Sequence, residues 1–139
     1  MPSRVIVDTS FLVALNDPKD SKHRMSISHV ATDTNHLMLP DVVLTEAAFL
    51  LGSASGIKGV LRFLERLIIT DPTLLPIENA DLPRIREIMG MYADARLDFV
   101  DCCLMALAER MNITTIYTFD RRDFTIFRPK HCYYLTLLP

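Results

Sequence analysis

Residues 97–124 combine an expected helix, a short strand and four aspartates, and no other stretch constrains the fold as strongly. Asp98 and Asp101 stand three residues apart near the helix start, which would place both carboxylates on one helix face. An apolar run along the helix predicts packing against a core, and residues 113–117 form an expected buried strand. Asp120 follows this strand at its carboxyl end, where active sites lie in open α/β sheets.

Short apolar segments alternate with helical patterns along the rest of the chain. Arg4 to Val7 predicts a buried strand, and Asp8 follows at its carboxyl end. Further strands are expected at 37–39, 74–77 and, as an edge strand, within 133–137, and helices at 10–15, 20–34, 42–51, 60–69 and 79–91. A Gly/Ser-rich break is expected at 53–59. This alternation predicts a single α/β domain over residues 1–139, with a three-layer α/β/α architecture and a short, mostly parallel sheet.

The connection rules for parallel strands reduce the possible arrangements to a few. The arrangement that we favour places the first strand beside the strand at 113–117, at the point where the strand order reverses. Asp8 and Asp120 would then face one another across the crevice that open sheets use for binding.

Composition limits the classes of function. The chain has 139 residues, 50% of them apolar, a formal charge of −2 and a pI near 6.0. It therefore has no overall basic field, and a bound polyanion would have to be held by a local patch or through metal ions. The three cysteines lack metal-ligand spacing, which favours reduced thiols. With no signal peptide and no run of about 20 apolar residues, we expect a soluble cytoplasmic protein without a membrane segment.

Five acidic residues are the candidate catalytic groups: Asp8, Glu46, Asp98, Asp101 and Asp120. The expected fold brings them to one edge of the sheet, where two carboxylates about 5 Å apart would repel by about 3 kcal/mol at a dielectric near 20. Such a cluster must take up protons or bind cations. Oxygen ligands without His or Cys suit Mg²⁺ or Mn²⁺ rather than zinc, and this chemistry points to hydrolysis of a nucleic-acid backbone.

Four ordered motifs, VDTSFLVAL, VVLTEAAFLL, DFVDCCLMALAER and IYTFDRRDF, carry a resemblance over nearly the whole chain. The chain resembles the PIN-domain ribonucleases, and most closely the VapC-type toxins of bacterial toxin–antitoxin pairs. The resemblance implies metal binding by Asp8, Glu46, Asp101 and Asp120, with Asp98 as the extra acid of a subgroup and Asp123 before the typical Phe. It also implies a Mg²⁺-dependent endoribonuclease that forms homodimers and is inhibited by an antitoxin inserted into the acidic groove.

RNA would also need positive charge, and two clusters of basic residues are candidates: Arg121, Arg122, Arg128 and Lys130 after the last acid, and Lys19, Lys22 and Arg24 after the first helix. Ordinary solvated surface charge explains them equally well.

Two other functions stay open. One is a non-catalytic PIN-fold module that binds RNA or protein. The other is a phosphate-transferring enzyme with Asp8 as its nucleophile, although Ser10 stands where a second aspartate would act as acid and base.

Overall fold

The structure is a computed structural model that describes residues 2–139. Its strands form one sheet in the order β3-β2-β1-β4-β5, and every neighbouring pair is parallel. The strands are β1 (Arg4–Val7), β2 (His36–Pro40), β3 (Thr73–Leu75), β4 (Thr115–Tyr117) and β5 (Thr136–Leu138). The predicted parallel sheet is therefore confirmed, with an edge strand at each end.

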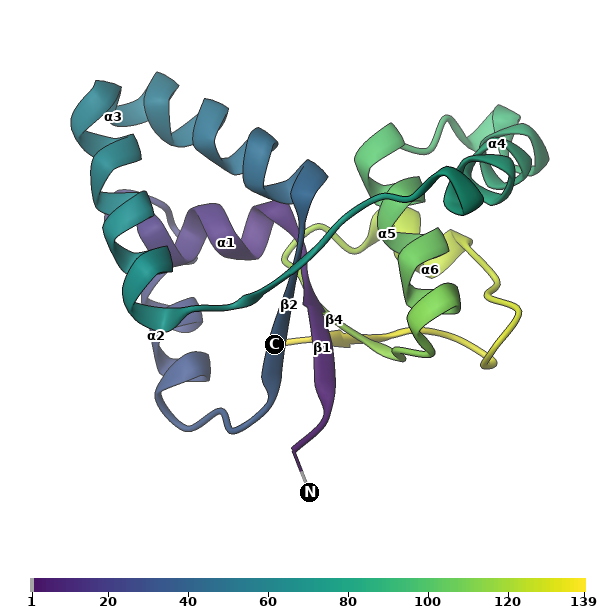
Figure 1. Ribbon diagram of the computed structural model, residues 1–139, viewed down its shortest axis with the longest axis horizontal. Coiled ribbons are helices and arrows are strands. Elements are labelled where there is room, and N and C mark those ends of the chain that lie inside the picture. The colour runs from purple at the N-terminus through teal and green to yellow at the C-terminus, as the bar shows by residue number, and fades with distance from the viewer. Residues whose placement is uncertain (1) are drawn as a thin grey trace.

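Helices cover both faces of the sheet in three layers (Figure 1). One face carries α1 (Thr9–Asn16), α2 (His23–Ala31) and α3 (Asp41–Thr70), and the other carries α4 (Leu82–Met91), α5 (Phe99–Met111) and α6 (Arg122–Ile126). Short 3₁₀ turns at 79–81 and 93–95 lead into α4 and α5. The observed architecture is the predicted α/β/α fold.

The centre of the sheet is the pairing of β1 with β4. Ile6 lies beside Ile116 and Val7 beside Tyr117, and the amide of Asp8 donates a 2.9 Å hydrogen bond to the carbonyl of Tyr117. The chain runs outward from β1 through β2 to β3 and then returns to β4 on the other side. The strand order thus reverses between β1 and β4, as predicted, and the residues after both strands meet at one edge.

The core is built from the strands and from α5, whose residues 102–108 are all buried. Cys102 and Cys103 lie in this helix as free thiols. Burial raises the pKa of the Cys102 thiol to about 12 and that of Cys103 to about 11. Both side chains therefore act as small apolar core residues rather than as reactive groups.

The predicted break at 53–59 is confirmed as a kink at Gly56 that divides α3 into two halves. Gly56 has φ 67° and ψ −162°, a backbone region that is essentially restricted to glycine. The residues on both sides stay helical, so α3 continues for 30 residues. The two halves of α3 can point in different directions because the bend falls at a residue without a side chain.

One helix bears on the expectation that the chain has no membrane segment. Among residues 2–139, α3 is the one helix that is long and apolar enough to cross a membrane, by length and composition only. This length spans the kink at Gly56, and each half of α3 is shorter, as the sequence pattern predicts. The finding is weak evidence for a membrane segment because core helices of soluble proteins pass the same test.

Candidate active site

The carboxyl ends of β1 and β4 open into a polar cleft of about 440 Å³. Seven acidic residues line it: Asp8, Asp20, Glu46, Asp98, Asp101, Asp120 and Asp123. All five acids that the sequence predicts are among them. They arrive from separate elements: Asp8 follows β1, Glu46 lies in the first half of α3, Asp98 and Asp101 stand at the start of α5, and Asp120 follows β4.

Asp8 is the most buried carboxylate of the cleft, with 3% of its surface exposed. Its Oδ2 accepts hydrogen bonds from the hydroxyls of Thr118 at 2.6 Å and Ser10 at 3.1 Å. Burial raises the pKa of Asp8 to about 6, and these hydrogen bonds oppose the rise because they favour the charged form. Asp8 occupies the N-cap position of α1, but its side chain makes no capping hydrogen bond and is free to face the cleft.

Asp101 is the most strongly perturbed acid of the cleft. Burial, followed by the charge of Asp8 and a hydrogen bond shared with Asp123, raises the pKa of Asp101 to about 9. Near neutral pH this carboxyl group therefore holds a proton as long as no cation is bound. The arrangement resembles other pairs of neighbouring carboxyl groups that cannot both ionise.

Asp98 does not share a helix face with Asp101 as the three-residue spacing suggests. The helix begins at Phe99, and Asp98 caps it in an extended conformation. Its Oδ2 accepts the amide hydrogens of Val100 at 3.1 Å and Asp101 at 3.3 Å. The carboxylate of Asp98 lines the cleft but is exposed, and it fixes the backbone that carries Asp101.

Asp123 is a cleft residue that sequence reasoning did not include among the candidate catalytic acids. It is 7% exposed, and its Oδ2 accepts the amide hydrogen of Asp98 at 2.8 Å. Burial alone would raise its pKa, but hydrogen bonds from Asp98, Asp101 and Arg122 hold the pKa of Asp123 below its usual value. The sequence feature that could have identified Asp123 is its position in the short helix after β4, two residues after Arg121.

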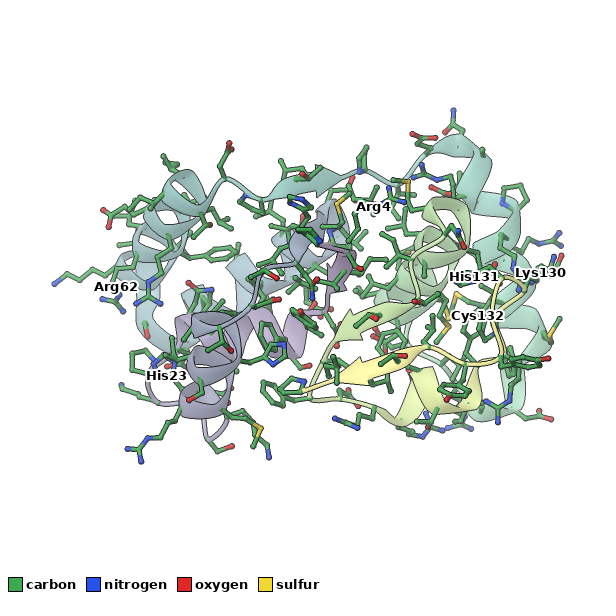
Figure 2. All side chains as sticks on the ribbon, turned by 90° about the horizontal axis from the view of Figure 1, so that it is seen from below. Arg4, His23, Arg62, Lys130, His131 and Cys132 are labelled. Atoms are coloured by element: carbon green, nitrogen blue, oxygen red, sulfur yellow. The ribbon has the colours of Figure 1, made fainter. Side chains whose placement is uncertain are left out.

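The two basic clusters contribute little to the lining of the cleft. Among residues 2–139, Lys22 is the one Lys or Arg side chain in the cleft lining. Arg122 pairs with Asp123 at 2.8 Å and donates to the carbonyl of Ala95, and Arg121 donates to the carbonyl of Pro139. Figure 2 shows Lys130 on the side of the molecule opposite to His23, the first residue of α2. The two readings of these clusters, phosphate contact or ordinary surface charge, therefore both stay open, with Lys22 in the lining and Arg122 beside it through Asp123.

The donor set of the cleft fits a hard divalent cation. Its lining offers carboxyl oxygens and neither His nor Cys, which suits Mg²⁺ or Mn²⁺. In the part of the chain that the structure describes, neither Asp8 nor Asp101 takes part in an ion pair. Among these same residues no three Asp, Glu, His or Cys side chains already stand in a metal-binding arrangement. Binding would therefore require the carboxylates to draw together around the ion.

Comparisons with known sequences agree with this geometry. The PIN domain family matches residues 5–128. Ribonuclease VapC26 of Mycobacterium tuberculosis is 28% identical to this chain over 125 residues, which cover 90% of this chain and 93% of the relative.

Solved structures show the same fold. VapC20 of Mycobacterium tuberculosis, described as a toxin that cleaves the sarcin-ricin loop, has a TM-score of 0.80 at 21% identity, covering 88% of this chain and 94% of its own. VapBC2 of Rickettsia felis, bound to a promoter DNA fragment, has a TM-score of 0.70 at 13% identity and covers 96% of each chain. DNA-bound VapBC of Salmonella typhimurium has a TM-score of 0.67 at 14% identity, and the match covers 99% of this chain and 97% of its own. With a family match that spans most of its length, this chain belongs to the PIN-domain family.

Proposed function

We propose that this protein is a Mg²⁺-dependent endoribonuclease that hydrolyses RNA phosphodiester bonds as the toxin of a type II toxin–antitoxin pair. The observation that carries the proposal is the acidic cleft at the carboxyl ends of β1 and β4, where Asp8 and Asp101 lie buried and outside the ion pairs of the described residues. The relatives support it, because one is named a ribonuclease and another is described as an RNA-cleaving toxin.

Four acids are the proposed ligands of Mg²⁺ or Mn²⁺: Asp8, Glu46, Asp101 and Asp120. A bound ion would supply Lewis-acid chemistry, activating a water and stabilising the leaving oxygen of the phosphodiester. Asp98 and Asp123 complete the proposed catalytic set as groups that hold the start of α5 and so position Asp101.

The protonation states of the two buried acids fit this role. The hydroxyls of Thr118 and Ser10 hold Asp8 oriented and favour its charged form. Asp101 keeps its proton until a cation favours the carboxylate, because metal ligands must be deprotonated. A protonated Asp101 thus limits the uncompensated negative charge in the cleft before a cation binds.

The test compares RNA cleavage by the wild-type chain and by Asp8→Asn and Asp101→Asn in the presence of Mg²⁺. We expect each substitution to reduce cleavage by at least about 100-fold, since each removes a charged ligand at an unchanged size. Asp94→Asn is the matched control, because Asp94 is exposed and does not line the cleft. Circular dichroism checks that the variants fold.

Two outcomes would contradict the proposal. Cleavage by Asp8→Asn and Asp101→Asn at the wild-type rate would show that the site lies elsewhere. A wild-type chain that binds RNA or protein, fails to cleave RNA and shows no Mg²⁺ binding by calorimetry would favour the non-catalytic binding module.

The phosphate-transfer alternative is disfavoured by the geometry of Asp8. The position two residues after Asp8, where such an enzyme needs a second carboxylate as acid and base, holds Ser10, whose hydroxyl donates to Oδ2 of Asp8 at 3.1 Å. Trapping a phosphorylated Asp8 would restore this alternative.

The proposed partners are RNA, a cognate antitoxin and a second copy of the chain, in the cytoplasm. Large apolar side chains on the second half of α3 support a protein interface, because Ile57, Ile68 and Ile69 are 72%, 77% and 81% exposed. Light scattering that reports a monomer for the wild-type chain would contradict the proposed homodimer. The reading frame beside the gene tests the antitoxin, which should be a short DNA-binding protein that copurifies with this chain.

A further inference from the structure

The charge balance of the cleft is very uneven. Seven acidic residues line it, and within residues 2–139 the single Lys or Arg in the lining is Lys22. The ammonium group of Lys22 takes part in none of the ion pairs in the described chain. A free cation at the mouth of an acidic cleft is therefore available to an incoming anion.

An aromatic ring supports this ammonium group. Nζ of Lys22 lies 5.9 Å from the centroid of the Phe119 ring, within the range of a cation–π contact. The Phe119 ring lies nearly parallel to that of Phe11, with centroids 5.6 Å apart and an angle of 21°. The amide of Phe119 also donates a 2.9 Å hydrogen bond to Oγ of Ser10. The ring under Lys22 is therefore held by stacking on Phe11 and by a backbone hydrogen bond to Ser10, which also lines the cleft.

The backbone of Lys22 is fixed as well. Its amide donates to Oδ1 of Asp20 at 2.8 Å, and its carbonyl accepts the amide hydrogen of Ser26 at 3.0 Å. The next residue, His23, is joined through Nδ1 to the carbonyl of Ala14 in α1 at 2.7 Å. Lys22 is thus presented from an ordered turn that is tied to the helix following Asp8.

We propose that Lys22 contacts a backbone phosphate of the RNA substrate and that Phe119 is the positioning residue for its ammonium group. This inference rests on the proposed ribonuclease function. A polyanion enters a cleft of carboxylates only with compensating cations. The metal ion would compensate at the reacting phosphate, and Lys22 would compensate at a neighbouring one.

Binding can be measured without cleavage by fluorescence anisotropy, using a short fluorescein-labelled single-stranded RNA and chains that carry Asp101→Asn. Lys22→Gln should raise the Kd about three- to tenfold and reduce the slope of log Kd against log salt by about 0.7, the value for one phosphate contact in single strands. Lys22→Arg should keep the wild-type slope. Lys58→Gln is the matched control, because Lys58 is exposed on α3 outside the cleft.

A double substitution tests the part played by Phe119. Phe119→Leu should weaken RNA binding because the ammonium group of Lys22 loses its cation–π contact. Phe119→Tyr keeps an aromatic ring and should bind RNA as the wild-type chain does. When Phe119→Leu is added to Lys22→Gln, we expect no further loss, because the ring acts through the lysine. Additive losses would overturn the positioning role of Phe119.

Kinetics of the otherwise wild-type chain separate this inference from the proposed function. Lys22→Gln should raise KM about three- to tenfold and leave kcat within about twofold. Normal cleavage with an unchanged KM and salt slope would overturn the role of Lys22 and leave the nuclease intact. A shifted pH profile with an unchanged slope would also overturn it, because Lys22 would then be a counter-ion of the carboxylates. Absence of cleavage by the wild-type chain, together with RNA binding that depends on Lys22, would instead count against the nuclease.

Discussion

The hydroxyl of Thr118 donates a 2.6 Å hydrogen bond to Oδ2 of Asp8, across a sequence separation of 110 residues. Thr118 is fully buried, and its Oγ1 also accepts the amide hydrogen of Asp120 at 2.9 Å. One hydroxyl therefore connects the acid after β1 with the acid after β4. This contact sets both the orientation of Asp8 and the balance between its charged and neutral forms.

Removing this hydroxyl should shift the pH dependence of activity. Burial already raises the pKa of Asp8 to about 6, and the Thr118 hydrogen bond lowers it. Thr118→Val should therefore raise the pKa of Asp8 further and move the acid limb of kcat/KM to higher pH, because only the carboxylate binds a cation. Rates measured against pH test this, with Thr114→Val at an exposed position as the control. An acid limb at its wild-type position would contradict the role of Thr118.

Asp101 should make the metal-free protein less stable as the pH rises. Its pKa is raised from 3.8 to about 9 on folding, mainly by burial, so the folded state binds a proton that the unfolded state loses. The stabilisation is fully present below pH 3.8 and decreases as the pH rises toward 9. Asp101→Asn cannot ionise and should raise the Tm by about 3 °C or more at pH near 8, with little effect near pH 4.

Thermal unfolding in the presence of a chelator measures this difference. Asp94→Asn, at an exposed position, should change the Tm equally little at both pH values. If Asp101→Asn lowers the Tm at high pH, the buried carboxyl group is not a source of instability.

Mg²⁺ binding should release protons near neutral pH. Because the pKa of Asp101 is about 9, its carboxyl group must lose a proton to become a metal ligand. Calorimetry in two buffers of different ionisation enthalpy should report release of about one proton per ion. Asp101→Asn should remove this release and weaken binding, and identical heats in both buffers for the wild-type chain would show that Asp101 stays protonated.

Arg122 should act on catalysis through Asp123 rather than on RNA binding. Its guanidinium pairs with Oδ1 of Asp123 at 2.8 Å, and Asp123 in turn holds the amide of Asp98. Arg122→Gln should lower kcat about tenfold by loosening this arrangement, with an unchanged salt slope of RNA binding. Arg62→Gln, at an exposed position in α3, is the control. A flatter salt slope for Arg122→Gln would restore Arg122 as a phosphate contact.

The pair between α4 and α5 should contribute to stability. Arg84 donates from Nε and one terminal nitrogen to both oxygens of Glu109 at 2.7 and 2.9 Å, with side chains 16% and 10% exposed. Arg84→Gln should lower the free energy of unfolding by about 2 kcal/mol, since it leaves a mostly buried carboxylate without its partner. Arg86→Gln, at an exposed position in the same helix, should change it by less than about 0.5 kcal/mol. Denaturant titration measures both values.

The fold and the acidic cleft were largely predictable because their signals are local. A buried strand such as Arg4–Val7 is visible as a run of apolar residues, and Asp8 follows from its position after the strand. The parallel sheet then requires Asp8 and Asp120 to meet, because few strand orders satisfy the connection rules. The assignment of catalytic roles to these acids stays a proposal.

Other features were not predictable because they depend on contacts between distant residues. Asp123 is positioned by a hydrogen bond from the amide of Asp98, 25 residues away in sequence. No spacing pattern in the sequence predicts that hydrogen bond. Asp98 is the cap that precedes α5 rather than a residue of its first turn, because the helix begins at Phe99. The partners of Arg122, which include the carbonyl of Ala95, lie on other elements, so the sequence could not decide between surface charge and phosphate contact.

The pairing of β1 with β4 also determines when during synthesis the cleft can form. Thr118 is made 110 residues after Asp8, and β4 and Asp120 are made at about the same time as Thr118. A nascent chain that stops before residue 115 has no β4 to complete the central pairing, and it lacks the hydroxyl that holds Asp8. A translating ribosome therefore carries an unassembled cleft at least until Asp120 has been added.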